Sequence, residues 1–242
     1  SRVGDRIFAG ASSVIAIALA IIVILMFIFL IKTAAPTLSA NTDNFFTSRA
    51  WTTDRNPPAF GIQALLWTTV ISSLLALLIA VPLSVGIALF ITQLAPKKLA
   101  SPVAFVVDLL AAVPSIVFGL WGGIVFGSSG IVNGLRHAII AVLGWIPIFS
   151  EDPAWSSATG TVYLASLVLA IMILPIITAV SRDVMAQTPH DQIEAALALG
   201  STRWEVIKLA VLPHSRSGII SGAMLGLGRA LGETLAVTLI LQ

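Results

Sequence analysis

Long apolar runs alternate with shorter polar segments along this chain. Five runs reach the roughly 20 residues that a helix needs to cross a bilayer, at 7–31, 64–94, 101–126, 161–180 and 217–241. The pattern predicts an all-α, multi-pass membrane protein with one transmembrane domain over 1–242. The first run is too long for the core of a signal peptide. The last ends one residue before Gln242, so we expect a sixth span beyond this sequence.

Prolines and glycines interrupt two of these runs. Pro82 lies in the second run, and Pro114, Gly119 and the pair 122–123 lie in the third. Proline removes a backbone donor, so both prolines predict a kink or a helix break. Packing geometry and a role in gating explain such breaks equally well. Asp108, in the third run, is interpreted as a snorkelling or capping acid, with a gating contact as the alternative.

Composition places most of the chain in lipid and excludes several classes of function. Hydrophobic residues make up 57% and charged residues 10% of it, whereas soluble domains carry about 25% charged residues. The net charge is only +2 and no basic stripe is present, so we expect no nucleic-acid partner. There are no cysteines, and the three histidines are scattered: His137, His190 and His214. Neither a metal site nor a cofactor is therefore expected.

Basic residues predict the orientation, because cytoplasmic loops carry more of them. With the N-terminus inside, the inner segments hold eight: Arg2, Arg6, Lys97, Lys98, Arg182, Arg203, Lys208 and Arg216. The outer loops, 32–61 and 127–160, hold four: Lys32, Arg49, Arg55 and Arg136. The loop 181–215 is then cytoplasmic. A short apolar piece at 138–149, with Trp145 and Trp155 nearby, is an interfacial or a re-entrant segment.

The long loop 181–215 is patterned as helix. Thr188 is a candidate N-cap, Pro189 suits the first helical position, and Asp191 suits the positive end of the helix dipole. Gly200 is placed to end this helix in the left-handed conformation. Along it, one face carries four apolar or small residues that would let another protein approach closely: Ile193, Ala196, Leu197 and Gly200.

A second helix is predicted directly after Gly200. Thr202 and Glu205 have the spacing of a capping box, and Pro213 is expected to end this helix. Two short helices on a loop suit a mechanical contact with another protein. An amphipathic element lying on the membrane surface fits the same pattern.

Six residues of this loop form a spaced motif: Glu194, Ala195, Ala196, Gly200, Leu212 and Pro213. The motif resembles the EAA loop of ABC importer permeases, with Ala210 where isoleucine is usual. The resemblance implies the type I importer transmembrane fold and a loop helix that docks into a groove on a separate ATPase. The chain has no Gly-x-x-x-x-Gly-Lys-Ser/Thr loop, so we expect no enzymatic activity of its own. We call 181–215 the coupling segment.

Arg229 and Glu233 are charged residues inside the last apolar run. A charge there costs about 2.5–3.5 kcal/mol on insertion scales, so such residues face a bundle interior or an aqueous path. They are four residues apart and share a helix face. A structural ion pair and a role in the substrate path both stay open. A free guanidinium would favour an anion, because its fork of donors matches phosphate or carboxylate oxygens.

Glycines recur at four-residue spacing in the same run, at Gly218, Gly222 and Gly226 and again at Gly228 and Gly232. Small residues at this spacing permit close packing of helices. We expect such packing at a subunit interface.

The stretches 114–122 and 226–234 resemble a signature of phosphate-specific ABC permeases. The resemblance implies that Ser115, Arg229, Glu233 and Thr234 lie on a path for inorganic phosphate. It also implies a heterodimer with a PstA-like permease, PstB-like ATPases and an outer PstS-like phosphate-binding protein, in the cytoplasmic membrane of a prokaryote. The alternatives are another oxyanion, such as sulfate or molybdate, and an ion-coupled carrier or channel acting alone. A lone carrier typically shows paired inverted repeats, which this sequence lacks.

Overall fold

The computed structural model describes residues 2–52, 54, 57–127, 134, 137, 141 and 162–241. The expectations for 138–149, Trp145 and Trp155, and for most of the loop 127–160, lie outside the described residues. The chain forms two compact units, 1–67 and 68–242, which are described separately.

The first unit consists of a long apolar helix and a small hairpin. Helix α1 spans Arg2–Ala40 and is longer at both ends than the predicted 7–31. It is apolar all round and exposed along its length, as suits a helix whose solvent is lipid. Strands β1 (Trp51–Thr52) and β2 (Ala59–Phe60) pair antiparallel. The side-chain amide of Asn41 donates to the backbone carbonyl and accepts from the backbone N–H of the last residue of β2.

The secondary-structure elements of the second unit are all helices in its described residues. Its elements are α2 (Gln63–Leu89, which begins in the first unit), the π-helical η1 (Phe90–Leu94), α3 (Lys97–Ala111), α4 (Ser115–Gly127), α6 (Val162–Ala186), α7 (His190–Ala198), α8 (Arg203–Val206), the π-helical η4 (Ile207–Val211), α9 (Leu212–Leu231) and α10 (Leu235–Leu241).

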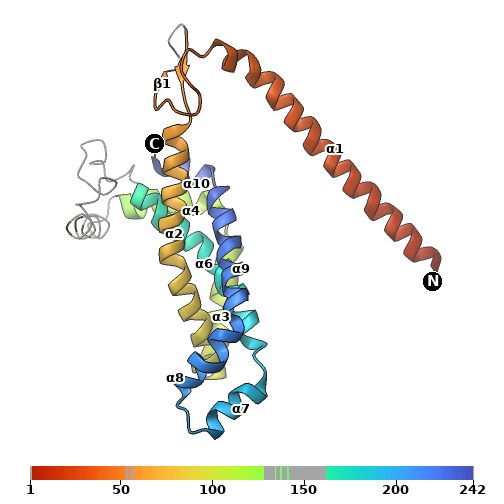
Figure 1. The fold of residues 1–242 in the computed structure, drawn as a ribbon, viewed down its shortest axis with the longest axis vertical. Coiled ribbons are helices and arrows are strands. Elements are labelled where there is room, and N and C mark those ends of the chain that lie inside the picture. The colour runs from red at the N-terminus through yellow and green to blue at the C-terminus, as the bar shows by residue number, and fades with distance from the viewer. Residues whose placement is uncertain are drawn as a thin grey trace. The chain divides into compact units, whose positions relative to one another are not determined.

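Helix α6 is the centre of this unit, and α3, α4, α9 and α10 pack against it (Figure 1). Side chains are buried all round it, among them Leu169, Ile173 and Ile177. From α2, Ser84 Oγ donates to the Leu174 carbonyl at 3.0 Å. A helix that is apolar on every face is stable when other helices surround it, which explains why α6 takes the central position.

Three of the glycines of α9 face α6 within the same chain. A Cβ built on Gly226 would lie 2.8 Å from Cδ1 of Ile177, and one on Gly222 would lie 3.2 Å from Cβ of Val180. Gly218 approaches Val184 just as closely. The expectation of a subunit interface is therefore wrong for these three glycines, and it stays a prediction for Gly228 and Gly232. Small-residue spacing indicates that a helix comes close, but not which helix.

Two of the predicted spans are broken. Helices α3 and α4 meet at a bend of 99° just before Pro114, which confirms the break predicted there. Pro82, in contrast, lies inside α2 without interrupting it. The last run was expected to be one helix, and this is wrong, because the chain leaves the helix over 232–234 between α9 and α10.

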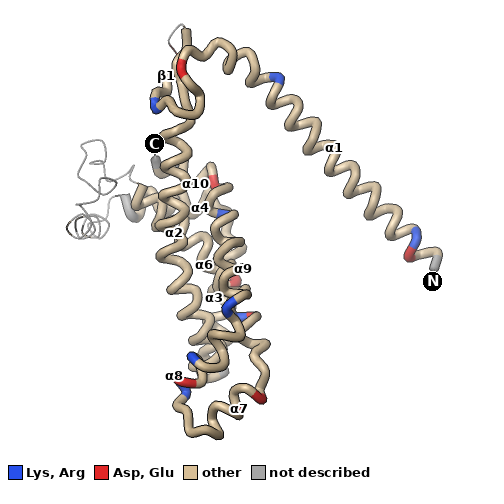
Figure 2. Tube along the Cα trace, viewed as in Figure 1, with Lys and Arg blue, Asp and Glu red and all other residues tan. Residues whose placement is uncertain are grey.

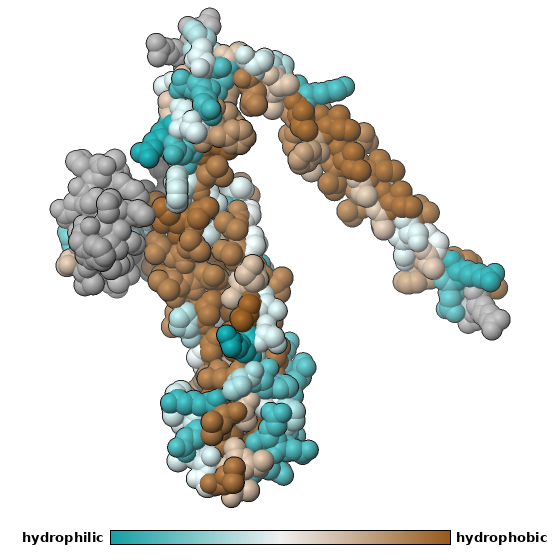
Figure 3. All heavy atoms as spheres, viewed as in Figure 1, coloured by the Kyte–Doolittle hydropathy of each residue, from teal (hydrophilic) through white to brown (hydrophobic). Residues whose placement is uncertain are grey.

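Three helices among the described residues are long and apolar enough to cross a membrane, or up to four if the bent pair α3–α4 counts as one span. The five spans therefore stay a prediction. Apolar atoms cover α1 and the middle of α2 (Figure 3). Charged residues gather around α7 and α8 (Figure 2).

Candidate coupling surface and substrate path

Helix α7 begins without the side-chain cap that the sequence predicts. Pro189, predicted to be the first helical residue, is the N-cap. The helix begins one residue later, at His190. Thr188 is buried, and its hydroxyl donates to the Met185 carbonyl at 2.9 Å. The predicted N-cap role of Thr188 is wrong, because this hydroxyl satisfies the end of α6 rather than the start of α7.

The end of α7 is confirmed at Gly200. This glycine has φ of +83°, a conformation that other residues rarely adopt. Its N–H donates to the Leu197 carbonyl at 2.9 Å, and that of Ser201 donates to the Ala196 carbonyl at 3.2 Å. These two bonds form a Schellman motif, which satisfies the last carbonyls of α7 and sets the turn toward α8.

The predicted capping box at the start of α8 is confirmed. The Glu205 N–H donates to Thr202 Oγ1 at 3.4 Å, and Glu205 Oε2 accepts from the Thr202 backbone N–H at 2.7 Å. The hydroxyl of Thr202 also donates to this carboxylate, at 2.8 Å. The bonds from Thr202, backbone first, lower the pKa of Glu205 below 4.5, with a smaller contribution from the positive charge of Lys208.

Pro213 does not end the second helix of the coupling segment. Helix runs from α8 through η4 directly into α9, with Pro213 in the first turn of α9. In the π-helical turn, the Leu212 N–H donates to the Ile207 carbonyl, five residues back. Proline has no N–H to donate, and the wider turn before it lets the chain remain helical. The coupling segment is thus continuous with α9.

A small apolar cluster anchors this continuous helix to the ends of α2 and α6. Ile207 and Val211 of η4 are buried with Met185 of α6 and with Ala88 and Leu89 of α2. Ala210, where isoleucine is usual in the EAA pattern, is also buried. A displacement of η4 must therefore displace the adjoining ends of α2 and α6.

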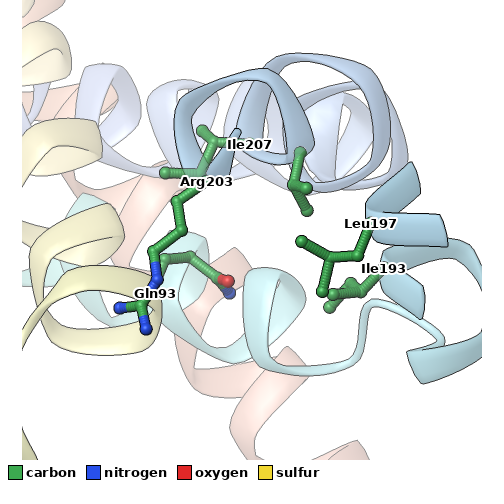
Figure 4. A pocket seen from close by; sticks show the side chains of 6 residues that line it. Gln93, Ile193, Leu197, Arg203 and Ile207 are labelled. Carbon is green, nitrogen blue, oxygen red and sulfur yellow. The ribbon is translucent and has the colours of Figure 1, made fainter. Parts of the chain in front are cut away.

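Two residues of the apolar face predicted for docking also contact the space beside the second helix. Ile193 and Leu197 line a pocket of about 170 Å³ whose other walls are Gln93, Arg203, Val206 and Ile207. Figure 4 shows Ile193 and Leu197 extending from α7 into this space. Ile193 is half-buried there, whereas Leu197 stays 49% exposed, so the docking role of this face stays a prediction.

The outward surface of α7 carries other residues of the motif. Glu194, Ala195 and Gly200 are exposed, and Ala196 is half-buried. Leu199, which sequence reasoning missed, is 88% exposed. The signal for it was a leucine directly before the helix-ending glycine, out of step with the Ile193–Leu197 stripe. At the junction with α9, Leu212 is half-buried and Pro213 is exposed.

Arg229 lies in the last turn of α9, whereas Glu233 lies in the break between α9 and α10. Arg229 is half-buried, and no hydrogen bond or ion pair joins its side chain to another described residue. Glu233 Oε1 accepts from the backbone N–H of Ala236 at 3.0 Å, so it caps α10. The described residues therefore contain no Arg229–Glu233 pair, because the break removes the helical register on which that pair depended.

The other two predicted path residues lie near the same break. Thr234 is exposed within it, and Ser115 is the half-buried first residue of α4. Helices α4 and α10 pack closely, since a Cβ built on Gly119 would lie 2.7 Å from Cα of Ala236. Ser115 is one turn before Gly119, and Thr234 is two residues before Ala236. The two helix breaks are thus brought into one neighbourhood.

Asp108 accepts from Arg182, which links α3 to α6. Arg182 Nη1 lies 3.4 Å from both carboxylate oxygens of Asp108. Its Nε lies 3.3 Å from Asp183, the next residue of α6. The described residues contain no group of three His, Asp or Glu side chains that could hold a metal ion.

Residues 80–242 match the family model described as "Binding-protein-dependent transport system inner membrane component". The chain belongs to this family. Relatives include the "Phosphate transport system permease protein PstC 2" of Mycobacterium tuberculosis, 48% identical over 100% of this chain and 74% of the relative. The PstC of Mycobacterium leprae is 52% identical over 98% and 74%, and that of Pasteurella multocida is 43% identical over 89% and 69%.

Membership confirms the expected type I ABC transmembrane fold. The chain is a permease component of an ABC importer in a membrane, and the ATPase is a separate subunit.

Proposed function

We propose that this chain is a permease subunit through which an ABC importer moves inorganic phosphate across the cytoplasmic membrane. The observation that carries the proposal is Arg229, a half-buried guanidinium that has no counter-ion among the described residues. A cation left unpaired inside a membrane bundle is costly, and an anion passing along the bundle would offset that cost.

The surroundings of Arg229 favour an anion as well. Ser115 offers a hydroxyl at the first turn of α4, near the positive end of that helix dipole. Glu233 is already engaged at the start of α10, so it does not neutralise Arg229 directly. The relatives with 43–52% identity are phosphate transport permeases by name, which supports phosphate as the cargo.

Coupling to ATP hydrolysis would occur at the outward surface of α7. Glu194, Ala195 and Leu199 are exposed on α7 and at its C-terminal end. The left-handed conformation of Gly200 fixes the turn that follows them. A groove on a PstB-like ATPase would receive this surface. Because α8, η4 and α9 are continuous, a push on α7 would reach Leu212 and Pro213 at the base of α9.

The complete importer would contain a PstA-like second permease and a PstS-like phosphate-binding protein outside the membrane. The N-terminus and the coupling segment would face the cytoplasm, in agreement with the excess of basic residues there. The spans are proposed at 7–31, 64–94, 101–126, 161–180 and 217–241, the third and fifth each divided by a break.

Replacing Arg229 by glutamine tests the proposal. We expect phosphate uptake by the assembled importer to fall about 10- to 100-fold, the range for losing a charge-assisted hydrogen bond. Arg216→Gln, an exposed site on the same helix, is the matched control and should keep uptake. Co-purification of the subunits checks assembly. Unchanged uptake by the Arg229→Gln importer would contradict the assigned path.

Competition experiments test the cargo separately. Labelled phosphate uptake should resist an excess of sulfate or molybdate. Strong competition by either anion would assign the importer to that oxyanion while leaving the coupling role intact.

A further inference from the structure

The ion pair between α3 and α6 is weak in itself and unusual in its placement. Among the described residues, Arg182 makes the ion pairs, one with Asp108 across the helices and one with Asp183 along α6. Asp108 is 54% exposed and Arg182 is 23% exposed. Pairs this open to their surroundings add little stability, so stability alone does not account for it.

The pair joins the start of the coupling segment, at Arg182, to the helix that precedes the Pro114 bend. Arg182 is three residues before Met185, which is buried in the cluster that anchors η4. Asp108 is six residues before Pro114, in the helix that leads into the 99° bend. Beyond the bend lies Ser115, at the start of α4. A short chain of rigid elements thus runs from the coupling segment to the broken helix.

Apolar packing gives α3 little other attachment. Val107 is its one fully buried apolar residue among those described, and Leu110 packs partly against the core. Four large apolar side chains of α3 are exposed: Leu99, Phe105, Val106 and Leu109. The Asp108–Arg182 contact is the ion pair that joins α3 to α6 among the described residues.

The shared guanidinium makes this contact easy to break and re-form. If α3 moves away, Arg182 keeps Asp183 as its partner on the same helix. Asp108 is already half exposed, so it gains access to water or lipid headgroups without a large change of environment. Neither charge is left buried and alone, which is the condition that makes broken ion pairs costly.

We propose that the Asp108–Arg182 contact transmits displacement of the coupling segment to the Pro114 bend, and so to the start of α4. Asp108 is a positioning residue in this scheme, because it acts through Arg182 and does not touch the cargo. The inference rests on the proposed function, since it takes α7 as the ATPase contact and the α4–α10 neighbourhood as the phosphate path.

The test compares uptake with ATP hydrolysis in proteoliposomes that contain the complete importer. For Asp108→Asn, we expect phosphate uptake to fall about 3- to 30-fold, the range for losing an energetic coupling, while ATP hydrolysis stays within twofold of wild type. Asp183→Asn is the matched control, because it removes the partner along α6 and leaves the contact with α3. The exchanged pair Asp108→Arg with Arg182→Asp should recover at least half of the uptake.

A distance measurement tests the same idea without disturbing the pair. The chain has no cysteines, so Val106→Cys on α3 and Ala186→Cys on α6 can carry two spin labels. We expect their separation to differ between the nucleotide-free and the trapped, ATP-driven importer. An unchanged separation would overturn the proposal. So would an Asp108→Asn importer that hydrolyses as many ATP molecules per phosphate taken up as the wild type does. A wild-type importer that hydrolyses ATP but takes up no phosphate would contradict the proposed function alone. The change in spin-label separation would still test whether the Asp108–Arg182 contact transmits movement.

Discussion

The coupling segment and the break between α9 and α10 differ in how their geometry is specified. The turn at Gly200 and the capping box at Thr202 depend on residues within a few positions of one another. The break at 232–234 has local bonds too, among them the one from the Ala236 N–H to Glu233, but the position of α10 beyond it depends on packing against α4 and α6. A docking surface must keep one shape, whereas a transport path must open and close. Hydrogen bonds between near neighbours suit a docking surface, and packing between separate helices suits a transport path.

The largest expected effect comes from filling the α4–α10 contact. Gly119→Val would place side-chain carbon against the backbone of Ala236, since a Cβ built there already lies 2.7 Å from its Cα. Overpacking of this kind costs about 1–3 kcal/mol or more, so the thermal unfolding temperature of the purified importer should fall and uptake should be lost. Gly123→Val, one turn further along α4, meets nothing within 4 Å and serves as the control. Equal effects of the two changes would contradict a path that depends on this contact.

A smaller effect is expected at the outward surface of α7. Leu199→Ala should weaken binding of the ATPase by about 2 kcal/mol if this leucine fills a pocket on the partner. Leu209→Ala, which truncates an exposed leucine of η4 outside α7, should leave binding within a few tenths of a kcal/mol. The dissociation constant of the ATPase from the permease pair in nanodiscs is the measurement. If Leu209→Ala weakens binding more than Leu199→Ala does, the docking surface lies on η4.

The smallest effect concerns the capping box and pH. The pKa of Glu205 is lowered in the folded chain, chiefly by the Thr202 backbone N–H, so the ionised form stabilises the start of α8. This contribution is fully present above pH 4.5 and is lost as the pH falls through the lowered folded value. Hydrogen exchange of the backbone amides of 202–206 should accelerate in that acidic range. Glu205→Gln, which cannot titrate, should remove this pH dependence of exchange. If wild type and Glu205→Gln show the same exchange rates across the pH range, the capping role is contradicted.

Local patterns predicted the parts of this fold that depend on a few consecutive residues. The Gly200 turn, the Thr202–Glu205 box and the Pro114 break all occur where the sequence placed them. Each depends on a backbone conformation or a hydrogen bond between near neighbours, and such features persist whatever the rest of the chain does. Thr188 is the exception, because its hydroxyl found an acceptor on the preceding helix instead.

Features that join distant residues could not be predicted in the same way. The Gly218–Gly226 spacing showed that a helix would come close, but the buried surface of α6 decided which helix it was. Pro213 was expected to end a helix, yet the π-helical turn at η4 and its buried Ile207 carry the helix past it. Asp108 and Arg182 are 74 residues apart in sequence, and nothing local relates them.

By itself, the sequence determined the membrane environment, the coupling motif and the presence of two charges in the last apolar run. Apolar content, motif spacing and the cost of charges in lipid do not depend on how helices pack. Only the tertiary structure decided that Arg229 and Glu233 separate at a helix break, that Ile193 and Leu197 line a pocket beside the second helix of the coupling segment, and that Asp108 reaches Arg182. These outcomes depend on which faces of separate helices meet, and that choice minimises exposed polar groups and unfilled space over the whole bundle rather than along any one segment.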